Sequence, residues 1–319
     1  MIGAVVTAIA AVISMPAHAQ DYPTQPVRML GPLAGGGSDM VMRLIAPVLR
    51  TALGQPVIVD NRPSLLIPEV GMKAPPDGHT LLVLGSSFMI GHLIRDTPWD
   101  PVRDFAPVVL ADTAPSVLLT HPSLPVKSVK ELIALAKAHP GQLNYASGGT
   151  GSAQHLPMEM LRVEAGINIV HVPYKGLGPA YSDVLGGQVP MMFAGVSNVV
   201  PYMKSGRLRV LAIGSPKRST SLPEIPTVAE SGVPGFDFDS WTGYLVPPAT
   251  PSAVIAKLHA DITRTLALPD VREKLVTLGF DLVGGTPDAF ATLIRNDLAR
   301  FGKLVKARSE EHTSELQSH

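Results

Sequence analysis

The sequence predicts an α/β fold made of two similar domains. Two short apolar runs each lead into a glycine-rich loop and then into a helix-like pattern, first at 31–39 and again at 147–155. Other continuous apolar runs, such as 81–84, are typical of strands buried in a parallel sheet. Strands that alternate with helices indicate α/β architecture, and 319 residues are enough for two domains of ordinary size.

The first half of the chain supplies three predicted strands, at 27–30, 57–59 and 81–84. Apolar residues after the first glycine-rich loop recur at helical spacing. Ser38 or Asp39 is the expected N-cap of this helix, and Gly54 is its expected end.

A second unit begins with the apolar run at Val117. Ser128 and Glu131 have the spacing of a capping box, which predicts a helix to about Ala138. A strand at 143–146 enters the second glycine-rich loop. Further strands are predicted at 169–172, 189–193 and 209–213, and long amphipathic helices at 251–266 and 286–306.

Composition and missing motifs exclude several classes of function. The formal net charge is zero, so the basic patch of a nucleic-acid-binding protein is not expected. The chain has no cysteine, which excludes disulfides, thiol catalysis and cysteine-ligated metals. Neither loop matches the phosphate-binding or dinucleotide-binding glycine patterns, and the zinc-protease and hydrolase-elbow motifs are missing. No cofactor and no metal are therefore expected.

The two glycine-rich loops predict a site for a small anion. Glycine lets the backbone approach a ligand closely, and a helix N-terminus offers unpaired N–H groups with partial positive charge. In the first loop we expect Gly35, Gly36 and Gly37 to present N–H groups, or to form only a tight turn, and Ser38 to donate its hydroxyl. Asp39 is favoured as a helix cap, because a carboxylate would repel an anion. The candidates in the second loop are Thr150, Gly151 and Ser152.

The two ends of the chain carry different signals. Residues 1–19 predict a secretory signal peptide, with an apolar stretch and a small-residue cleavage site that ends at Ala19. No Lys or Arg precedes that stretch, and an uncleaved anchor is the alternative, although the stretch is short for a membrane span. Residues 308–319 are polar, break the preceding helical pattern and resemble the translation of a sequencing-library adapter. We treat them as an artefact tail.

Several motifs together resemble one family, the Bug (TctC) extracytoplasmic solute receptors of tripartite tricarboxylate transporters. The resemblance covers about 22–307 and rests on the second glycine-rich loop and on 61–63, 76–80, 100–107, 171–176, 226–232 and Trp241. It implies a two-domain periplasmic-binding-protein (Venus flytrap) fold, each lobe a Rossmann-like sheet flanked by helices. It also implies a cleft that binds a small organic anion, namely a di- or tricarboxylate, an acidic amino acid or an aromatic carboxylate. The implied partners are two inner-membrane transporter subunits.

The resemblance completes the predicted site and domains. The predicted ligand-binding residues are Leu33, Ala34, Gly35, Gly36, Gly37, Ser38, Asp39, Ser147, Gly149, Thr150, Gly151, Ser152, His155 and Tyr174. One lobe is expected to comprise 20–117 and 245–307, the other 118–244, with hinges near Val117 and Leu245. We expect a periplasmic monomer that binds no nucleic acid.

The sequence departs from the family at two places, and it leaves two other functions possible. Gly31-Pro32 stands where the family has an aromatic residue entering the first loop, and 64–68 replaces a glycine-rich stretch. The alternatives are a sensor that signals to a membrane partner, and a periplasmic serine hydrolase. The hydrolase would use Ser38 or Ser152 with His155, but the sequence has no recognisable spacing for an activated nucleophile.

Overall fold

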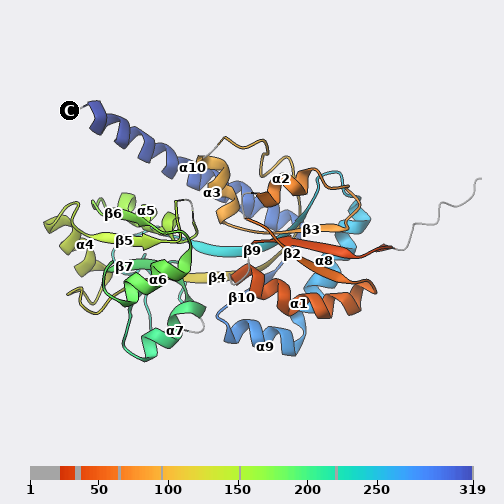
Figure 1. The fold of residues 1–319 in the computed structure, drawn as a ribbon, viewed down its shortest axis with the longest axis horizontal. Coiled ribbons are helices and arrows are strands. Elements are labelled where there is room, and N and C mark those ends of the chain that lie inside the picture. The colour runs from red at the N-terminus through yellow and green to blue at the C-terminus, as the bar shows by residue number, and fades with distance from the viewer. Residues whose placement is uncertain are drawn as a thin grey trace, which may run out of the picture.

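In this computed structural model the two predicted units are two lobes joined by a long strand (Figure 1). The structure describes residues 22–32, 37–63, 66–94, 96–150, 152–219 and 222–317. The first lobe lies on the right in Figure 1 and the second on the left. The predicted signal peptide at 1–19 lies outside the described residues, as do five predicted site residues: Leu33, Ala34, Gly35, Gly36 and Gly151.

The first lobe is built on a sheet whose parallel strands come from the start of the chain. β1 (Val27–Gly31) pairs in parallel with β2 (Val57–Asn61) and β3 (Thr80–Gly85), which confirms the three predicted strands. Three antiparallel strands complete this sheet: β9 (Asp239–Val246), the first part of β4 (Ala106–Thr120) and β10 (Asp281–Gly284). β3 is buried along most of its length, which explains its continuous apolar sequence.

The second lobe repeats this plan on the other part of β4. β5 (Asn144–Ser147) pairs in parallel with β6 (Val170–Pro173) and β7 (Met191–Gly195). β7 and β8 (Arg209–Ile213) both pair with β4 in the antiparallel direction. The fold therefore agrees with the predicted pair of α/β units.

The chain crosses between the lobes at two neighbouring points. Within β4, Pro115 pairs with Asp239 in the first sheet, whereas Ser116 pairs with Gly195 in the second. β9 pairs with first-lobe strands from Asp239 onward, before the predicted boundary at 245, and Leu245 lies inside the first sheet opposite Leu82. The two crossings therefore lie side by side at Pro115 and Asp239.

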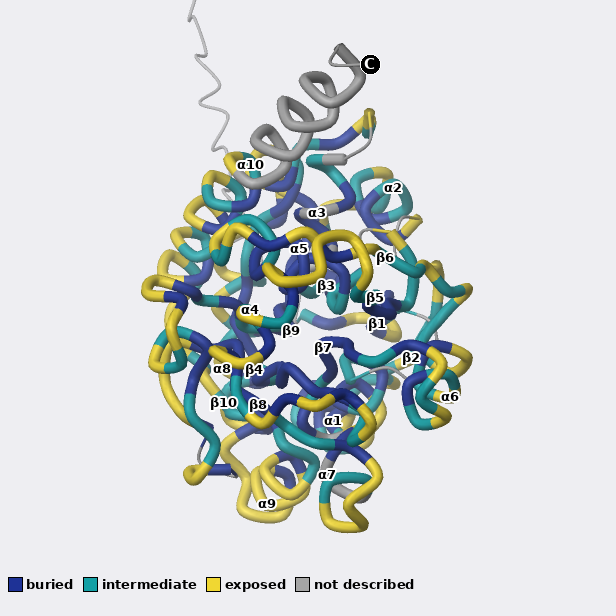
Figure 2. The backbone as a smooth tube through the Cα atoms, turned by 90° about the vertical axis from the view of Figure 1, so that its left-hand side faces the viewer, coloured by how far each residue is buried: buried dark blue, intermediate teal, exposed yellow. Residues whose placement is uncertain are grey.

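Helices cover both faces of each sheet, so the strands lie in the buried centre of the molecule (Figure 2). Those of the first lobe are α1 (Gly37–Leu53), α2 (Leu66–Met72), α3 (Ser87–Ile94), α8 (Ser252–Ala267) and α9 (Pro269–Thr277). Those of the second are α4 (Val129–Ala138), α5 (His155–Glu164), α6 (Leu177–Leu185) and α7 (Val196–Lys204). Within the described ranges, no helix is long and apolar enough to cross a membrane.

Three helix ends test the sequence predictions. α1 begins at Gly37, so Ser38 and Asp39 lie in its first turn and the predicted N-cap is wrong. Ser128 does cap α4, because its hydroxyl accepts the backbone N–H of Glu131. α10 (Pro287–Gln317) begins at Pro287 as expected and stays helical to Gln317, so the predicted break after 307 is wrong.

Candidate ligand-binding site

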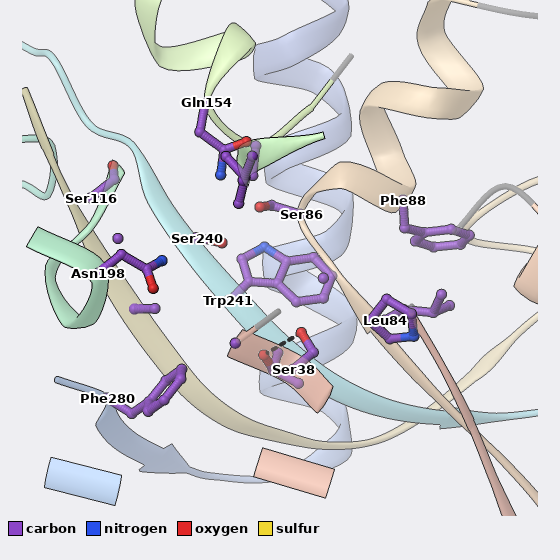
Figure 3. A pocket seen from close by; sticks show the side chains of 18 of the residues that line it. Ser38, Leu84, Ser86, Phe88, Ser116, Gln154, Asn198, Ser240, Trp241 and Phe280 are labelled. Carbon is purple, nitrogen blue, oxygen red and sulfur yellow. Dashed lines mark hydrogen bonds between the residues drawn. The ribbon is translucent and has the colours of Figure 1, made fainter. Parts of the chain in front are cut away.

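A cavity of about 410 Å³ lies between the two lobes, and β9 forms one of its walls (Figure 3). The first lobe lines it with Pro32, Gly37, Ser38, Ile67, Val83, Leu84, Gly85, Ser86, Phe88 and Phe280. The second lobe lines it with Ala153, Gln154, Leu177, Tyr181, Ala194, Gly195 and Asn198. The crossing strands add Ala114, Ser116, Ser240, Trp241 and Thr242. The cavity therefore needs both lobes to be complete.

Five of the helices in the described part of the chain begin at this cavity. In the first lobe, α1 begins at the cavity with Gly37, and α3 follows the lining residue Ser86. In the second lobe, α5 follows Gln154, α6 begins at Leu177, and α7 follows Gly195. A helix N-terminus carries unpaired N–H groups and about half a positive charge. The cavity is thus surrounded by partial positive charge from both lobes.

The side chains that line the cavity are uncharged in the described ranges. Its polar members carry hydroxyl or amide groups, and none is a Lys, Arg, Asp or Glu. In Figure 3 the side chain of Gln154 lies above Trp241 and that of Asn198 lies to its left. An anion placed here would therefore be held by neutral donors and helix N-termini, without repulsion from a lining carboxylate.

Two buried serine hydroxyls of the cavity have no hydrogen-bond partner among the described atoms. They are Ser86 Oγ at the start of α3 and Ser116 Oγ at the crossing in β4. Both residues are buried, at 1% and 5% exposure. Because buried polar groups are nearly always paired with protein or ordered water, these two hydroxyls indicate a place for a polar ligand or for water.

One side of the cavity is apolar. Ile67, Leu84 and Phe88 line it from the first lobe, and the buried indole of Trp241 forms its floor. The indole is fixed from behind, because its Nε1–H donates to Asp297 Oδ2 at 2.9 Å. Trp241 is therefore both a wall of the cavity and a packed core residue, two roles that the sequence left open.

Gly85 is required by the close approach of two strands beside the cavity. A Cβ atom at Gly85 would lie 2.8 Å from the backbone oxygen of Trp241. A backbone atom cannot move aside as a flexible side chain can, so a larger residue would push β3 away from β9. The shape of this part of the cavity thus depends on glycine.

Comparison with known proteins decides the family. The sequence matches the family described as "Tripartite tricarboxylate transporter family receptor", TctC, over residues 41–309. The chain belongs to this family. This confirms the resemblance inferred from the sequence motifs.

Three solved structures of similar sequence support the same assignment. The periplasmic binding protein BugD is 31% identical with a TM-score of 0.78, covering 90% of this chain and 98% of its own. The R. palustris protein Rpa4515, solved with adipate, is 32% identical with a TM-score of 0.81 over the same shares. MatC from Rhodopseudomonas palustris, solved with malate, is 32% identical with a TM-score of 0.79, covering 89% of this chain and 100% of its own. The receptor therefore has the two-lobed fold of periplasmic solute-binding proteins.

The first predicted loop of the receptor reaches the cavity. Gly37 and Ser38 line it, and Ser38 Oγ lies 3.0 Å from Thr242 Oγ1. Asp39 is not among the described lining residues. Its buried carboxylate accepts hydrogen bonds from Arg43 Nε at 3.0 Å and from Asn61 Nδ2 at 2.8 Å. Asp39 thus anchors the first loop from inside the first turn of α1, and not as the predicted helix cap.

The second predicted loop turns two of its side chains into its own lobe. Ser147 is fully buried, and its Oγ lies 2.6 Å from Nε2 of His171. The His155 ring is buried and lies 4.2 Å from the His171 ring, while Ser152 Oγ accepts the backbone N–H of His155. Ser147 and His155 form a packed layer behind the loop.

The remaining predicted residues of the second lobe lie around that layer. Gly149 N donates to Ser147 Oγ at 3.1 Å, Thr150 is exposed, and Tyr174 donates its O–H to Asp183 Oδ2 at 2.5 Å. The described cavity lining on this side instead comes from Ala153 and Gln154 at the start of α5. Gly37 and Ser38 are thus brought to the cavity, whereas six predicted residues are not among its lining: Ser147, Gly149, Thr150, Ser152, His155 and Tyr174.

Sequence reasoning missed several polar lining residues. Ser86 and Asn198 belong to short Gly-x-Ser-like segments that follow two predicted strands, after Gly85 and Gly195. A search for glycine within two residues after each predicted strand, and not only for long glycine-rich loops, would have pointed to both segments. Ser116 and Ser240 carry no such signal, because they lie within strands where the chain crosses between lobes.

Proposed function

We propose that this chain is an extracytoplasmic receptor that binds one small organic carboxylate in the cavity between its lobes. It would deliver this ligand to the membrane subunits of a tripartite tricarboxylate-type transporter. The observation that carries the proposal is the convergence of five helix N-termini on a cavity whose described lining has no charged side chain. A bound carboxylate would be the one full charge there, facing partial positive charges from both lobes.

The ligand we propose combines carboxylate groups with a hydrocarbon body. Rpa4515 and MatC, solved with adipate and malate, support a dicarboxylate. The apolar wall of Ile67, Leu84 and Phe88 supports the longer and less hydroxylated acid of the two, because it cannot hydrogen-bond a hydroxyl. The volume of about 410 Å³ lies within the usual range for small-molecule sites. Tricarboxylates, acidic amino acids and aromatic carboxylates are further candidates within this class.

The predicted loops complete the proposal if binding closes the lobes. Leu33, Ala34, Gly35 and Gly36 precede the lining residue Gly37, so their N–H groups are candidates for one carboxylate. Gly149, Thr150, Gly151 and Ser152 precede Ala153 and are candidates for the other, with Ser147, His155 and Tyr174 behind them. Closure would turn the two lobes about the crossings at Pro115 and Asp239, which lie near the predicted boundaries at 117 and 245.

We propose a binding role and not a hydrolytic one. Ser38 Oγ is paired with Thr242, and Ser152 Oγ accepts a backbone N–H, so neither hydroxyl is recorded beside an imidazole. Ser147 does lie 2.6 Å from His171 Nε2, but it is fully buried where no substrate reaches it. Nucleophilic catalysis needs an accessible nucleophile with an adjacent base. We further propose that the chain is exported, that its signal peptide is cleaved after Ala19, and that the mature protein is a monomer.

The test is a binding screen on purified, ligand-stripped protein. Adipate, malate, citrate, glutamate and nicotinate would be compared with their neutral amides by thermal unfolding and calorimetry. A ligand at about 100 times its Kd adds about 2.7 kcal/mol to the free energy of unfolding. We expect at least one acid to raise Tm by several degrees and its amide to have no effect. No rise with any acid, from a folded sample, would contradict the proposal.

A further inference from the structure

A buried carboxyl group lies behind the floor of the cavity and is not used by the site described above. Asp112 on β4 is fully buried, and the group recorded to stabilise its charge is the hydroxyl of Thr242 on the neighbouring strand. In the sheet it stands opposite Thr242 on β9 and Leu282 on β10. Burial of an ionised carboxylate without a cation is costly, so this environment favours the neutral, protonated acid.

A line of hydroxyls runs from this carboxyl to the cavity. Thr242 is the cross-strand neighbour of Asp112, and Thr242 Oγ1 lies 3.0 Å from Ser38 Oγ. Both Thr242 and Ser38 line the cavity, and Figure 3 shows their hydrogen bond below Trp241. The sequence Asp112, Thr242, Ser38 therefore leads from a buried titratable group to the first turn of α1.

Each hydroxyl has a single proton to donate, so the state of Asp112 sets the direction of the whole line. An ionised Asp112 only accepts, which draws the Thr242 proton toward it and the Ser38 proton toward Thr242. Ser38 would then offer only lone pairs to the cavity. A protonated Asp112 donates to Thr242, Thr242 donates to Ser38, and the Ser38 proton is left to point into the cavity.

We propose that Asp112 keeps a proton in the folded receptor, and that this proton orients Thr242 and Ser38 so that Ser38 donates to an anion in the cavity. Asp112 is then a positioning residue that makes anion binding depend on pH. This inference rests on the proposed function of the cavity. It also adds an electrostatic reason, because loss of the proton would place a negative charge behind a cavity that holds an anion.

The pKa of Asp112 and the charged groups around it agree with this role. Burial raises the pKa of Asp112 from 3.8 to about 8, and the neighbouring Thr242 hydroxyl offsets only part of that rise. On β9, burial raises the pKa of Tyr244 well above its ordinary value, and ionisation of Asp112 would raise it further, so this phenol stays neutral. On β10, the nearest acidic residue in sequence, Asp281, stands opposite Thr113. No cation is recorded to act on Asp112.

Three other buried acidic groups lie on helices of the first lobe and on α10, and each has partners of its own. Asp39 on α1 pairs with Arg43, Asp261 on α8 with Lys257, and Asp297 on α10 with Trp241 and Arg300. Asp112 differs from all three because no cation offsets its burial. Of these four carboxyl groups, Asp112 is the one whose surroundings most favour the protonated form.

The experiment measures the Kd of adipate, malate and citrate by calorimetry from about pH 6 to about pH 9.5. For the acid that binds, we expect affinity in the parent to fall about tenfold per pH unit above the pKa of Asp112. In Asp112→Asn the amide keeps a donor toward Thr242 but cannot titrate, so the affinity should stay constant over this range. Asp261→Asn is the matched control and should keep the parent profile.

The outcomes separate this inference from the function on which it rests. If an acid binds and the parent and Asp112→Asn have the same pH profile, the inference is overturned and the proposed function stands. If no acid binds at any pH, the proposed function fails and the inference fails with it. Should Asp112→Asn not fold, Thr242→Val takes its place, because it cuts the line of hydroxyls. It should reduce the loss of affinity between about pH 7 and about pH 9, and an unchanged loss would overturn the inference.

Discussion

The two glycine-rich loops start from the same pattern and are held in place by different chemistry. Each follows a parallel strand and is anchored by a side chain from the strand beside it. Asn61 at the end of β2 donates to Pro32 O at 2.6 Å and to Asp39 in the first loop. His171 on β6 lies 2.6 Å from Ser147 in the second loop. One anchor is an amide and the other an imidazole.

This difference decides which side chains face the ligand. The amide anchor is a small group at the strand end, and it leaves Ser38 to reach the cavity. The imidazole anchor stacks on His155 and Tyr145 with ring centroids 4.2 Å and 4.9 Å apart, so it builds a polar layer behind the second loop. Similar loop sequences can therefore turn their described side chains in different directions, Ser38 toward the cavity and Ser147 into its own lobe.

The largest effect is expected from breaking the layer behind the second loop. The Glu159 carboxylate is buried and accepts hydrogen bonds from Tyr145 and from Arg162, the latter at 3.1 Å. Glu159→Ala removes the acceptor of the buried Tyr145 hydroxyl and the charge partner of the partly buried Arg162, so we expect the free energy of unfolding to fall by about 4 kcal/mol. Urea unfolding at neutral pH measures this. Glu273→Ala, at an exposed position on α9, should cost less than about 0.5 kcal/mol. A loss below about 1 kcal/mol at Glu159 would mean that the layer does not stabilise this lobe.

The contribution of the crossing between the two lobes to stability should depend on pH. Burial raises the pKa of Asp239 from 3.8 to about 6, so the folded state binds this proton more tightly than the unfolded state does. This contribution to stability is present below about pH 4 and is lost as pH rises to about 6. Asp239→Asn removes the penalty and should add about 3 kcal/mol at neutral pH. Tm measured from about pH 4 to about pH 8 should diverge between parent and variant, and parallel curves would contradict the assignment.

The anchor of the first loop should matter less than the layer behind the second. Asn61→Ala leaves the Pro32 carbonyl and one oxygen of Asp39 without this donor, which should lower the free energy of unfolding by about 2 kcal/mol. It should also weaken adipate binding, because α1 begins from this loop. Asn168→Ala, at an exposed position, is the control for loss of an amide. If Asn61→Ala cost as much as Glu159→Ala, the contrast between the two anchors would not hold.

The smallest effects are expected on affinity alone. Gln154→Ala removes an amide donor that lines the cavity and should weaken adipate binding about tenfold, or about 1.4 kcal/mol, with Tm unchanged. Thr150→Ala, in the part of the second loop proposed to close on the ligand, should weaken it by about threefold. Calorimetry measures both, with Gln142→Ala at an exposed position as control. A larger effect at Thr150 than at Gln154 would make the loop itself the main contact of the second lobe.

The sequence by itself determined the α/β class, most strand positions and the family. The class and the strand positions follow from local patterns: continuous apolar runs such as β3, glycine after a strand, and the capping hydroxyl of Ser128. Each of these patterns depends only on residues that lie within a few positions of one another in the sequence. The family follows instead from the resemblance of several motifs taken together. The sequence also predicted Gly37 and Ser38 as site residues from a helix start after a buried strand, and both line the cavity between the lobes.

Only the tertiary structure decided which groups face one another. Ser38 meets Thr242 across 204 positions of sequence, and Asp112 stands behind both because β4 and β9 pair in one particular register. The turning of His155 into its lobe likewise depends on His171, which arrives on a different strand. Strand order, register and the crossing between lobes are set by packing of the whole chain. Local spacing carries no record of them, since side chains that meet across a cavity are free to come from any part of the sequence.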